Sequence, residues 1–433
     1  MMERTPETAP APWRPAVECL PRRELDTLQR FALAQAVTRA WGAPWYRERL
    51  RALGEVGEGL EPARFQTDVP LTSKADLRAA FTGAWNTGAR RPAMLLATSG
   101  TTGTRVPLPY TTDDLERWQE LAARTLWANG LRPTDTVLLP VPLGLYSGGH
   151  GMFAGLRRLG CTVIPLGPAP TPTLVDVLRG GLGLAPTTVV TLPSHMLRLL
   201  DSLPAAGIDP ADTGLRLASL GAEAWSEEAR ARIEAGFGLR AVDSYGIGEL
   251  CGPGVAAECE YRDGLHVWED AFFVEIVDAD GAPVPDGTPG ELVLTPLFRE
   301  TLPLLRYRTG DAAALLPGPC RCGRTHRRIT RILHRLDQVL IITGVNVDPG
   351  DVERILYRFP WVGQEYALAV EGEHRDALHV QVERHGQQAP PPDAEAQLTA
   401  AIRRDMPVRT RVTLCPHGSL ERAPGKVQRV IGR

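Results

Sequence analysis

Several features that would point to a membrane or secreted protein are missing from the sequence. No apolar run is long enough to cross a bilayer as a helix, and residues 1–14 carry proline and charges instead of an apolar signal core. The net charge is −3, with no long block of one sign, which argues against nucleic-acid or membrane-surface binding. Seven cysteines are an odd number in a chain of 433 residues, so we expect no disulfide framework and a cytoplasmic location.

Lysine is nearly absent. Only Lys74 and Lys426 are lysines among 48 Lys and Arg residues. Arginine carries a rigid charged fork, whereas lysine carries a compact charge on a flexible stem. A lysine in the tail segment 423–429 therefore suggests that a point charge is needed there, although the chance survival of one surface lysine is the alternative. Lys74 follows Thr72-Ser73, a pattern typical of a helix N-cap, and we expect it to have a structural role at the helix start.

The middle of the chain predicts an α/β fold. Short apolar runs alternate with stretches of helical periodicity, as expected for strands buried on both faces. From 266 to 300, Asp-Gly and Pro-Gly turns separate strand-like segments, which predicts a β-rich subdomain. A further helix is expected over 23–54. The expected strands are 136–139, 161–164 and 188–191, and the expected helices are 173–179 and 194–203.

The last hundred residues predict a small α+β domain of their own. Its expected helices are 349–357 and 394–404, and its expected strands are 366–370, 377–382 and 412–414. We therefore predict a large domain over 1–335 and a small one over 338–433, with a boundary near 337.

A Ser/Thr/Gly-rich loop, Thr98 to Thr104, follows the apolar segment 93–96. Small residues let the backbone approach a ligand, and hydroxyls and free amides can hold phosphate oxygens. The loop lacks the lysine of the Gly-x-x-x-x-Gly-Lys pattern and the three spaced glycines of the dinucleotide fingerprint. Alone it is also compatible with a surface turn.

With further segments, this loop makes the sequence resemble the adenylate-forming superfamily, and most closely the phenylacetate–CoA ligase family. The order and spacing match from about Lys74 to the terminus. The segments are 98–104, 221–225, 243–254, 306–311, 335–347 and 424–426, and Glu269-Asp270 adds to the match. The resemblance implies ATP-dependent conversion of a carboxylic acid to an acyl-adenylate, followed by transfer to the CoA thiol. Transfer to a carrier-protein thiol or an amine, or a non-catalytic nucleotide sensor, remain alternatives.

The resemblance also implies roles for individual residues. Thr101, Glu249 and Lys426 would be catalytic, with Glu249 binding Mg²⁺ and Lys426 facing the carboxylate and α-phosphate. Thr104 stands where the family generally has lysine. The other phosphate-loop residues are Thr98, Ser99, Gly100, Thr102 and Gly103, and the adenine side is formed by Gly221, Ala222, Glu223, Ser244, Tyr245 and Gly246. Asp311 would bind the ribose, and Arg335 the ribose or phosphates. Asp337 would be the hinge near 337 about which a mobile small domain turns between the half-reactions, and Gly344 would meet CoA.

A possible zinc site is formed by four residues. Cys259 and His266 have six residues between them, and Cys320 and Cys322 form a C-x-C pair in a turn. Three thiolates and one imidazole would suit a tetrahedral structural zinc. Unligated cysteines and an ordinary strand histidine are the alternative.

The resemblance places the acyl pocket around the segment 141–150. Tyr146 stands where phenylalanine is typical, and a buried phenol needs a polar partner, so we predict a polar aryl acid. The expected pocket residues are Val141, Tyr146, Gly148, His150, Cys251, Gly252 and Pro253. The expected partners are this acid, ATP and CoA, with a carrier protein or a second copy as further candidates and no nucleic acid or membrane.

Overall fold

The computed structural model describes residues 11–51, 53–54, 59–81, 91–98, 105–372, 376–386, 388–421 and 429–431. Its contacts divide the chain into two compact units. One unit holds 1–167 with 242–331, and the other holds 168–241 with 332–433. The division into 1–335 and 338–433 remains a prediction. No helix in the described part of the chain is long and apolar enough to span a bilayer.

Five short-to-medium helices open the first unit. They are α1 (Pro15–Glu18), α2 (Arg22–Trp41), α3 (Pro44–Arg49), α4 (Pro62–Asp68) and α5 (Lys74–Phe81). The single helix expected over 23–54 is wrong, because α2 ends at Trp41 and Pro44 begins a new helix. Proline lacks the N–H that a helix interior needs but suits a first turn. The predicted cap of α5 is confirmed, since Ser73 Oγ accepts from the Asp76 N–H at 3.1 Å.

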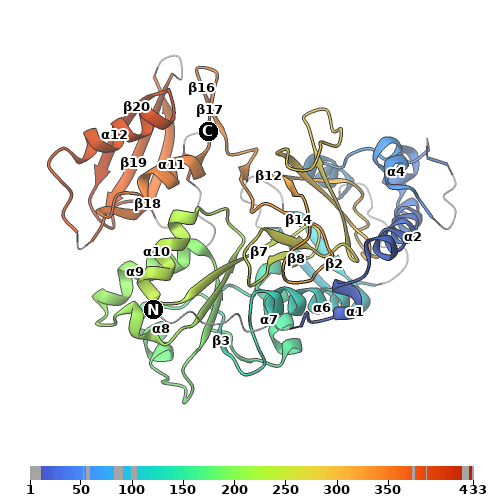
Figure 1. The fold of residues 1–433 in the computed structure, drawn as a ribbon, viewed down its shortest axis with the longest axis horizontal. Coiled ribbons are helices and arrows are strands. Elements are labelled where there is room, and N and C mark those ends of the chain that lie inside the picture. The colour runs from blue at the N-terminus through green and yellow to red at the C-terminus, as the bar shows by residue number, and fades with distance from the viewer. Residues whose placement is uncertain are drawn as a thin grey trace. The chain divides into compact units, whose positions relative to one another are not determined.

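The first unit is built on largely antiparallel strands (Figure 1). The strands β7 (Arg240–Ile247), β8 (Gly252–Glu258), β9 (Leu265–Val267), β14 (Arg328–Ile329) and β13 (Leu315–Leu316) are neighbours in that order. A second sheet joins β10 (Phe272–Val277), β11 (Gly290–Pro296) and β12 (Tyr307–Ala313), which confirms the predicted β-rich region. β1 (Met94–Ala97) and β2 (Pro107–Tyr110) form a hairpin, and β3 (Thr136–Leu138) runs parallel to β4 (Thr162–Ile164).

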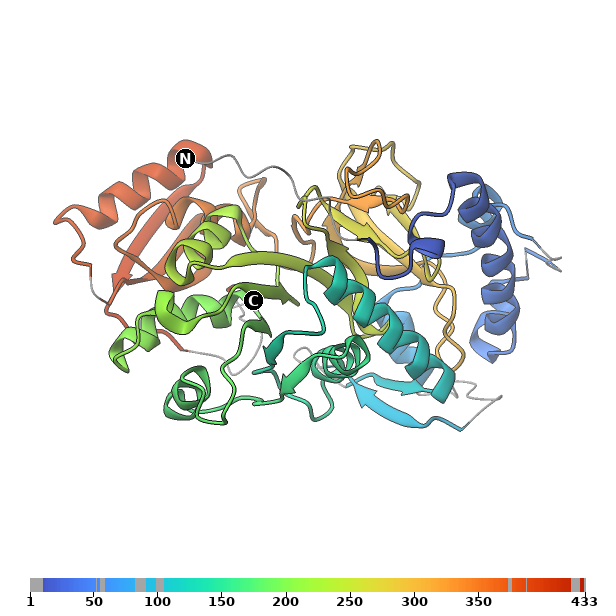
Figure 2. The ribbon, with the colours of Figure 1, turned by 60° about the horizontal axis from the view of Figure 1, so that its bottom comes forward.

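Two helices of the first unit cover strand β8. They are α6 (Thr112–Ala128) and α7 (Ser147–Leu159), and they pack against each other and against β8 (Figures 1 and 2). Gly155 permits the close helix contact, because a Cβ there would lie 2.7 Å from the Cβ of Ala122. This packing positions the first turn of α7, which belongs to the segment 141–150 that is predicted to line the acyl pocket.

The second unit begins with the predicted strand-helix alternation. It runs α8 (Thr171–Leu178), β5 (Thr188–Thr191), α9 (Pro193–Ala205), a 3-10 turn (Pro210–Thr213), β6 (Leu217–Gly221) and α10 (Glu227–Phe237). β5 and β6 pair in parallel, and all four residues of β5 are buried. Burial on both faces explains why this strand shows no alternation of apolar and polar residues.

The tail forms the predicted α+β arrangement. Its elements are β15 (His334–Arg335), β16 (Leu340–Ile342), β17 (Val345–Val347), α11 (Pro349–Leu356), β18 (Val362–Glu371), β19 (Ala377–Arg384), α12 (Ala394–Asp405) and β20 (Arg409–Cys415). β19 pairs with β18 in antiparallel and with β20 in parallel, and α12 packs on β20 (Figure 1). The mixed α/β fold class, with a small C-terminal domain, is therefore confirmed.

Buried polar contacts join α10 to the tail within the second unit. The Arg232 guanidinium donates to the carbonyls of Tyr357 and Phe359 at 2.9 and 2.8 Å. Glu353 of α11 accepts from the N–H and hydroxyl of Ser226, at 3.2 and 2.9 Å. Burial raises the pKa of Glu353 and lowers the pKa of Arg232. These contacts hold α11 and the start of β18 against α10.

Candidate active site

The structure brings Tyr245 and Asp311 together. The Tyr245 phenol, on β7, donates to Asp311 Oδ2, on β12, at 2.6 Å. Both side chains are buried. Gly246 follows at a register shift where β7 meets β8, and a Cβ there would lie 2.0 Å from the carbonyl oxygen of Gly252. Only glycine fits where the two strands approach so closely. Tyr245 and Asp311, both predicted to bind the nucleotide, therefore lie beside a closely packed strand pair in the first unit.

The turn after β7 presents Glu249. The Arg299 guanidinium donates to the Leu250 carbonyl at 3.0 Å, and the Tyr110 hydroxyl makes a longer contact of 3.5 Å to the Gly248 carbonyl. Arg299 is itself buried and lies 4.1 Å from the centre of the Tyr110 ring. The carbonyls on either side of Glu249 are thus engaged. No motif pointed to Tyr110 or Arg299, and only their three-dimensional contacts reveal them.

The Glu249 carboxylate has unused capacity to bind a cation. The residue is 4% exposed, and its buried Oε1 accepts no hydrogen bond from the residues that the structure describes. The ammonium of Lys74, at the start of α5, lies 3.0 Å from this oxygen. A buried carboxylate oxygen is a suitable ligand for a hard divalent cation, so the site fits Mg²⁺. Lys74 is the first residue of α5, as expected, and its side chain also reaches Glu249.

The phosphate loop closes at its base through Thr98. Its N–H donates to the Val106 carbonyl at 3.0 Å, and its hydroxyl accepts from the Val106 N–H at 3.1 Å. The hydroxyl keeps its own proton for donation to a ligand. Ser99, Gly100, Thr101, Thr102 and Gly103 lie outside the described residues, as does Lys426.

In the second unit, Glu223 caps a helix. It accepts from the N–H and the hydroxyl of Ser194, near the start of α9, at 3.1 and 3.0 Å. Gly221 ends β6, and Ala222 follows with a φ of 70°. This left-handed conformation is rare for a residue with a Cβ and is typical of functional turns. The predicted adenine-side segment is therefore a strained turn fixed by Glu223.

The predicted hinge and CoA-facing residues lie on exposed segments of the second unit. Arg335 donates to Asp337 at 3.0 Å, and the Asp337 side chain is 64% exposed. Thr343 and Gly344, with φ values of 48° and 84°, form the two-residue turn between β16 and β17. Positive φ at both positions matches the tight hairpin turn that glycine favours. Ile341 on β16 is 69% exposed, which leaves an apolar side chain on this hairpin facing solvent.

The two segments predicted to line the acyl pocket are adjacent. A Cβ on Gly252 would lie 3.1 Å from Ser147 Oγ at the start of α7, and Trp118 donates to the Pro253 carbonyl at 2.8 Å. Tyr146 packs over Gly148, since a Cβ on Gly148 would lie 2.4 Å from the phenol ring. Val141 is buried, and His150 Nε2 lies 2.8 Å from the Gly144 carbonyl oxygen. Burial raises the pKa of Cys251 to about 12, so its thiol stays protonated.

The four predicted zinc ligands converge. The ligand atoms of Cys259, His266, Cys320 and Cys322 all lie within 4.8 Å of one another. Cys259 Sγ is 3.7 Å from Cys320 Sγ, and Cys322 Sγ is 3.3 Å from His266 Nε2. A tetrahedral zinc with Zn–S bonds of about 2.3 Å has S···S edges of about 3.8 Å, so the donor set fits zinc. Hydrogen bonds from Cys259 and Cys320 lower the pKa of Cys322.

The loop that carries Cys320 and Cys322 also anchors the N-terminal segment. Arg324 pairs with the buried Glu18 at 2.6 Å, and the Thr325 N–H donates to the Glu18 carbonyl at 3.0 Å. His326 Nε2 lies 3.1 Å from the Val17 carbonyl oxygen. The position of residues 17–20 therefore depends on the loop that the cysteines would fix.

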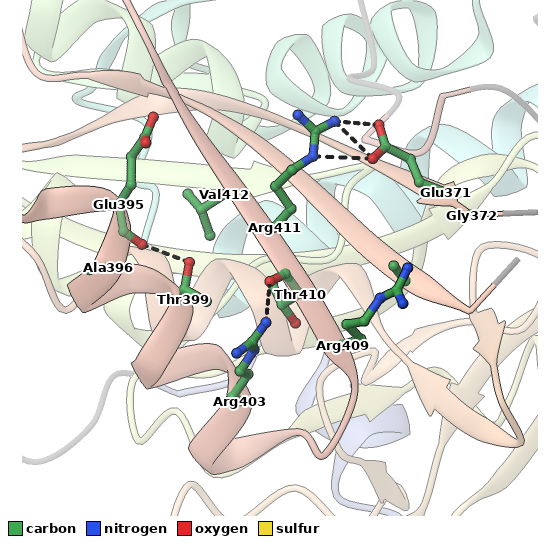
Figure 3. A pocket seen from close by; sticks show the side chains of 11 residues that line it. Glu371, Gly372, Glu395, Ala396, Thr399, Arg403, Arg409, Thr410, Arg411 and Val412 are labelled. Carbon is green, nitrogen blue, oxygen red and sulfur yellow. Dashed lines mark hydrogen bonds and ion pairs between the residues drawn. The ribbon is translucent and has the colours of Figure 1, made fainter.

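A cavity of about 510 Å³ lies elsewhere, in the tail, between α12 and β20 (Figure 3). None of the predicted site residues lines it. Its arginines are engaged, since Arg411 pairs with Glu371 at 2.7 Å, Arg409 with Asp376 at 3.2 Å, and Arg403 donates to the Thr410 carbonyl at 3.0 Å. Each of these three guanidinium groups thus already has a partner within the protein.

Comparison with known proteins places this site in a family. Residues 54–295 match the family model of AMP-binding enzymes, and residues 344–433 match that of the AMP-binding enzyme C-terminal domain. A phenylacetate–coenzyme A ligase of Aromatoleum evansii is 36% identical, with 96% of each chain covered. One from Pseudomonas putida is 37% identical, over 96% of this chain and 95% of its own.

The solved structures agree on the fold. A 2-hydroxyisobutyryl-CoA ligase in the postadenylation state, in complex with 2-HIB-AMP, superposes with a TM-score of 0.87 at 24% identity, covering 100% of this chain and 94% of its own. The chain belongs to the AMP-binding enzymes. Within that family it is an AMP-forming acid–CoA ligase, which activates an acid with ATP and transfers the acyl group to CoA.

Proposed function

We propose that the chain activates an aryl carboxylic acid, with free CoA as the acyl acceptor. The observation that carries the proposal is the buried Glu249 carboxylate, whose Oε1 accepts no hydrogen bond within the described residues and lies 3.0 Å from the Lys74 ammonium. Arg299 holds the turn that carries it, through the Leu250 carbonyl. Such a carboxylate is suited to bind the cation of a nucleotide, rather than to stabilise the core through hydrogen bonds. The relatives named phenylacetate–coenzyme A ligase support an aryl acid.

The nucleotide roles follow from the contacts. Asp311 would accept from the ribose hydroxyls while Tyr245 fixes its carboxylate, because a carboxylate offers about four lone-pair sites. The Tyr245 ring would flank the adenine. Mg²⁺ on Glu249 would neutralise phosphate charge when the carboxylate of the acid attacks the α-phosphate. The phosphate loop would position the β- and γ-phosphates. Lys426 would balance charge between the attacking carboxylate and the α-phosphate.

The tail would act in the second half-reaction. The hairpin turn at Thr343-Gly344 would meet the CoA thiol after rotation about Asp337. The exposure of both the turn and Asp337 supports this role. The same tail would carry Lys426 toward the phosphates in the first half-reaction.

We also propose that Cys259, His266, Cys320 and Cys322 hold a structural zinc. All four positions carry protein ligands, which is the arrangement of a closed structural site rather than a catalytic one. The spacing of the donor atoms supports the assignment. Zinc would fix the loop of Arg324 to His326 and, through it, the segment at Glu18.

The test is a mass-spectrometric screen of aryl and short alkyl acids with ATP, Mg²⁺ and CoA. We expect an acyl-CoA from an aryl acid, AMP in equal amount, and a preference for hydroxy- or aminobenzoate over phenylacetate because of Tyr146. A clear preference for phenylacetate or a fatty acid would contradict the polar-aryl assignment. Acyl transfer to a carrier-protein thiol or an amine, and not to CoA, would show that CoA is not the acyl acceptor. Gel filtration of the same preparation tests for the homodimer, and cell fractionation tests the cytoplasmic location.

A sensor that binds nucleotide without catalysis is the alternative from another class. It would bind ATP and form no acyl-AMP with any acid in the panel. The Glu249→Gln variant is the matched control, because it keeps the shape of the side chain and loses the charge. If wild type and Glu249→Gln give the same acyl-AMP yield, Glu249 does not have the assigned role.

A further inference from the structure

We propose that Lys74 is a further catalytic residue, whose ammonium contacts the β- and γ-phosphates of ATP and stabilises the pyrophosphate leaving group beside Glu249. The inference rests on the proposed function, because it assumes that Glu249 faces a cation-bound nucleotide. It assigns to the first lysine of the chain a role that the sequence did not indicate.

The backbone before Lys74 is fixed to the strand that carries Asp311. The Thr72 N–H donates to the Arg306 carbonyl at 2.9 Å, and the Arg308 N–H donates back to the Thr72 carbonyl at 2.9 Å. The Thr72 hydroxyl donates to the Leu305 carbonyl at 2.7 Å. These three bonds tie the segment before α5 to β12 and to the two residues that precede it. Lys74 therefore has a defined position relative to the residue expected to bind the ribose.

The side chain is placed for a ligand rather than for stability. Its ammonium lies 3.0 Å from Glu249 Oε1, yet the Lys74 side chain remains 45% exposed while that of Glu249 is 5% exposed. A half-exposed ion pair contributes little to stability. The Glu249 carboxylate is thus buried beside a cation, whereas the Lys74 ammonium remains accessible to solvent or to a phosphate.

The choice of lysine supports this interpretation. Where the described chain pairs a buried carboxylate for stability, it uses arginine, as in Arg124–Asp270, Arg306–Glu275 and Arg324–Glu18. A guanidinium would bind the carboxylate with two parallel hydrogen bonds and occupy both oxygens. An ammonium on a flexible stem can leave one oxygen for a metal and turn toward a phosphate. Lysine therefore replaces the usual arginine at position 74, where the charge would have to turn from Glu249 toward a phosphate.

The position also compensates for a missing charge. Thr104 stands in the phosphate loop where lysine is expected, so the loop supplies no ammonium of its own. In adenylation the bond between the α- and β-phosphates breaks, and its electron pair moves to the leaving pyrophosphate. Negative charge grows on the phosphate side of the bond, where Lys74 would lie. One such electrostatic contact is worth about 10²-fold in rate.

The experiment compares wild type with Lys74→Met, which keeps an unbranched apolar stem, and Lys74→Arg, which keeps the charge. Arg30→Met is the control, because it breaks an exposed ion pair with Glu61 and a long hydrogen bond to Thr27. Isothermal titration measures binding of Mg²⁺-pyrophosphate and of AMP without any turnover. We expect Lys74→Met to weaken pyrophosphate binding by about 10-fold or more and to leave AMP binding within about 2-fold. Lys74→Arg should recover part of the loss.

The two half-reactions are then measured separately. Adenylation should fall by about 10²-fold in Lys74→Met, whereas thioester formation from supplied acyl-adenylate should stay near wild type. Unchanged pyrophosphate binding, or an equal loss in both half-reactions that follows a lower melting temperature, would overturn the proposal. A wild-type protein that binds pyrophosphate through Lys74 but adenylates no acid would instead contradict the proposed function, so the two failures are distinguishable.

Discussion

The Tyr245 phenol donates a 2.6 Å hydrogen bond to Asp311 Oδ2, and both side chains are buried. This bond orients the carboxylate that we assign to the ribose. The Tyr245→Phe variant removes only the hydroxyl, and a hydrogen bond to a charged group contributes about 1.5–3 kcal/mol. We expect AMP affinity to fall by about 10-fold or more by isothermal titration. The order of preference among acids should not change. A variant with unaltered AMP affinity would show that Asp311 is oriented by other contacts.

Asp270 provides a test of stability against pH. Burial raises the pKa of its carboxyl, but the charges of Arg124 and Arg117 outweigh burial and lower the pKa below its usual range. Arg124 lies 2.6 Å from Asp270 Oδ1, and its side chain is fully buried. Asp270→Asn would leave that guanidinium with only the more distant Glu120 carboxylate, at 3.5 Å, so we expect a loss of about 3–5 kcal/mol at neutral pH. Urea unfolding of the two proteins measures the difference.

The sign of the pH dependence follows from the depressed pKa. The unfolded chain binds a proton at Asp270 near pH 4, while the folded protein binds it only at lower pH. The stabilisation by Asp270 is therefore complete above about pH 5 and is lost as the pH falls through the folded pKa. The gap between wild type and Asp270→Asn should narrow between pH 5 and pH 3. A gap that stays constant over this range would contradict the assigned ion pair.

The order of strands and helices could be predicted from the sequence, because burial on one or both faces leaves a periodic apolar pattern. The β5–β6 region and the tail show this. The break between Trp41 and Pro44 was missed, because apolar periodicity continues through the short interruption. Motif residues such as Tyr245 and Asp311 were found, since their spacing matches a family. Lys74, Tyr110 and Arg299 were not assigned to the site, because their roles arise from contacts between segments distant in sequence.

Zinc removal should affect stability and the N-terminal segment together. We expect purified protein to contain about one zinc per chain, and Cys322→Ser to lose it with a fall in melting temperature of at least about 5 °C. Hydrogen exchange should increase at residues 14–20, because Glu18 and Val17 are held by the cysteine-bearing loop. Cys415→Ser, outside the cluster, is the control and should change neither quantity. Metal analysis that finds no zinc in the wild type would contradict the proposed zinc site.

Lys426→Ala should separate the two half-reactions. If its ammonium faces the attacking carboxylate and the α-phosphate, adenylation from ATP should fall by about 10²-fold or more. Thioester formation from supplied acyl-adenylate should persist, because that step begins after the phosphates have left. ATP–pyrophosphate exchange measures the first step, and acyl-CoA release measures the second. Equal losses in both would argue against a role confined to adenylation. A double variant with Lys74→Met shows whether the two ammonium groups act independently, since their free-energy losses would then add.

The contact between α10 and the tail predicts the last effect. Arg232 donates to the carbonyls of Tyr357, Phe359 and Val362, which follow α11. Its guanidinium lies 4.4 Å from the centre of the Tyr357 ring. In Arg232→Met the Tyr357 carbonyl loses this donor, while the Phe359 carbonyl keeps the Val362 N–H at 3.1 Å. We expect a cost of about 1–3 kcal/mol for each group left unsatisfied. Arg354→Met is the matched control, because it breaks only a half-exposed pair with Asp351 on α11 and should cost less than about 0.5 kcal/mol. Urea unfolding compares the two, and hydrogen exchange at residues 357–362 should rise only in Arg232→Met. Equal behaviour of the two variants would show that α10 does not hold the tail through Arg232.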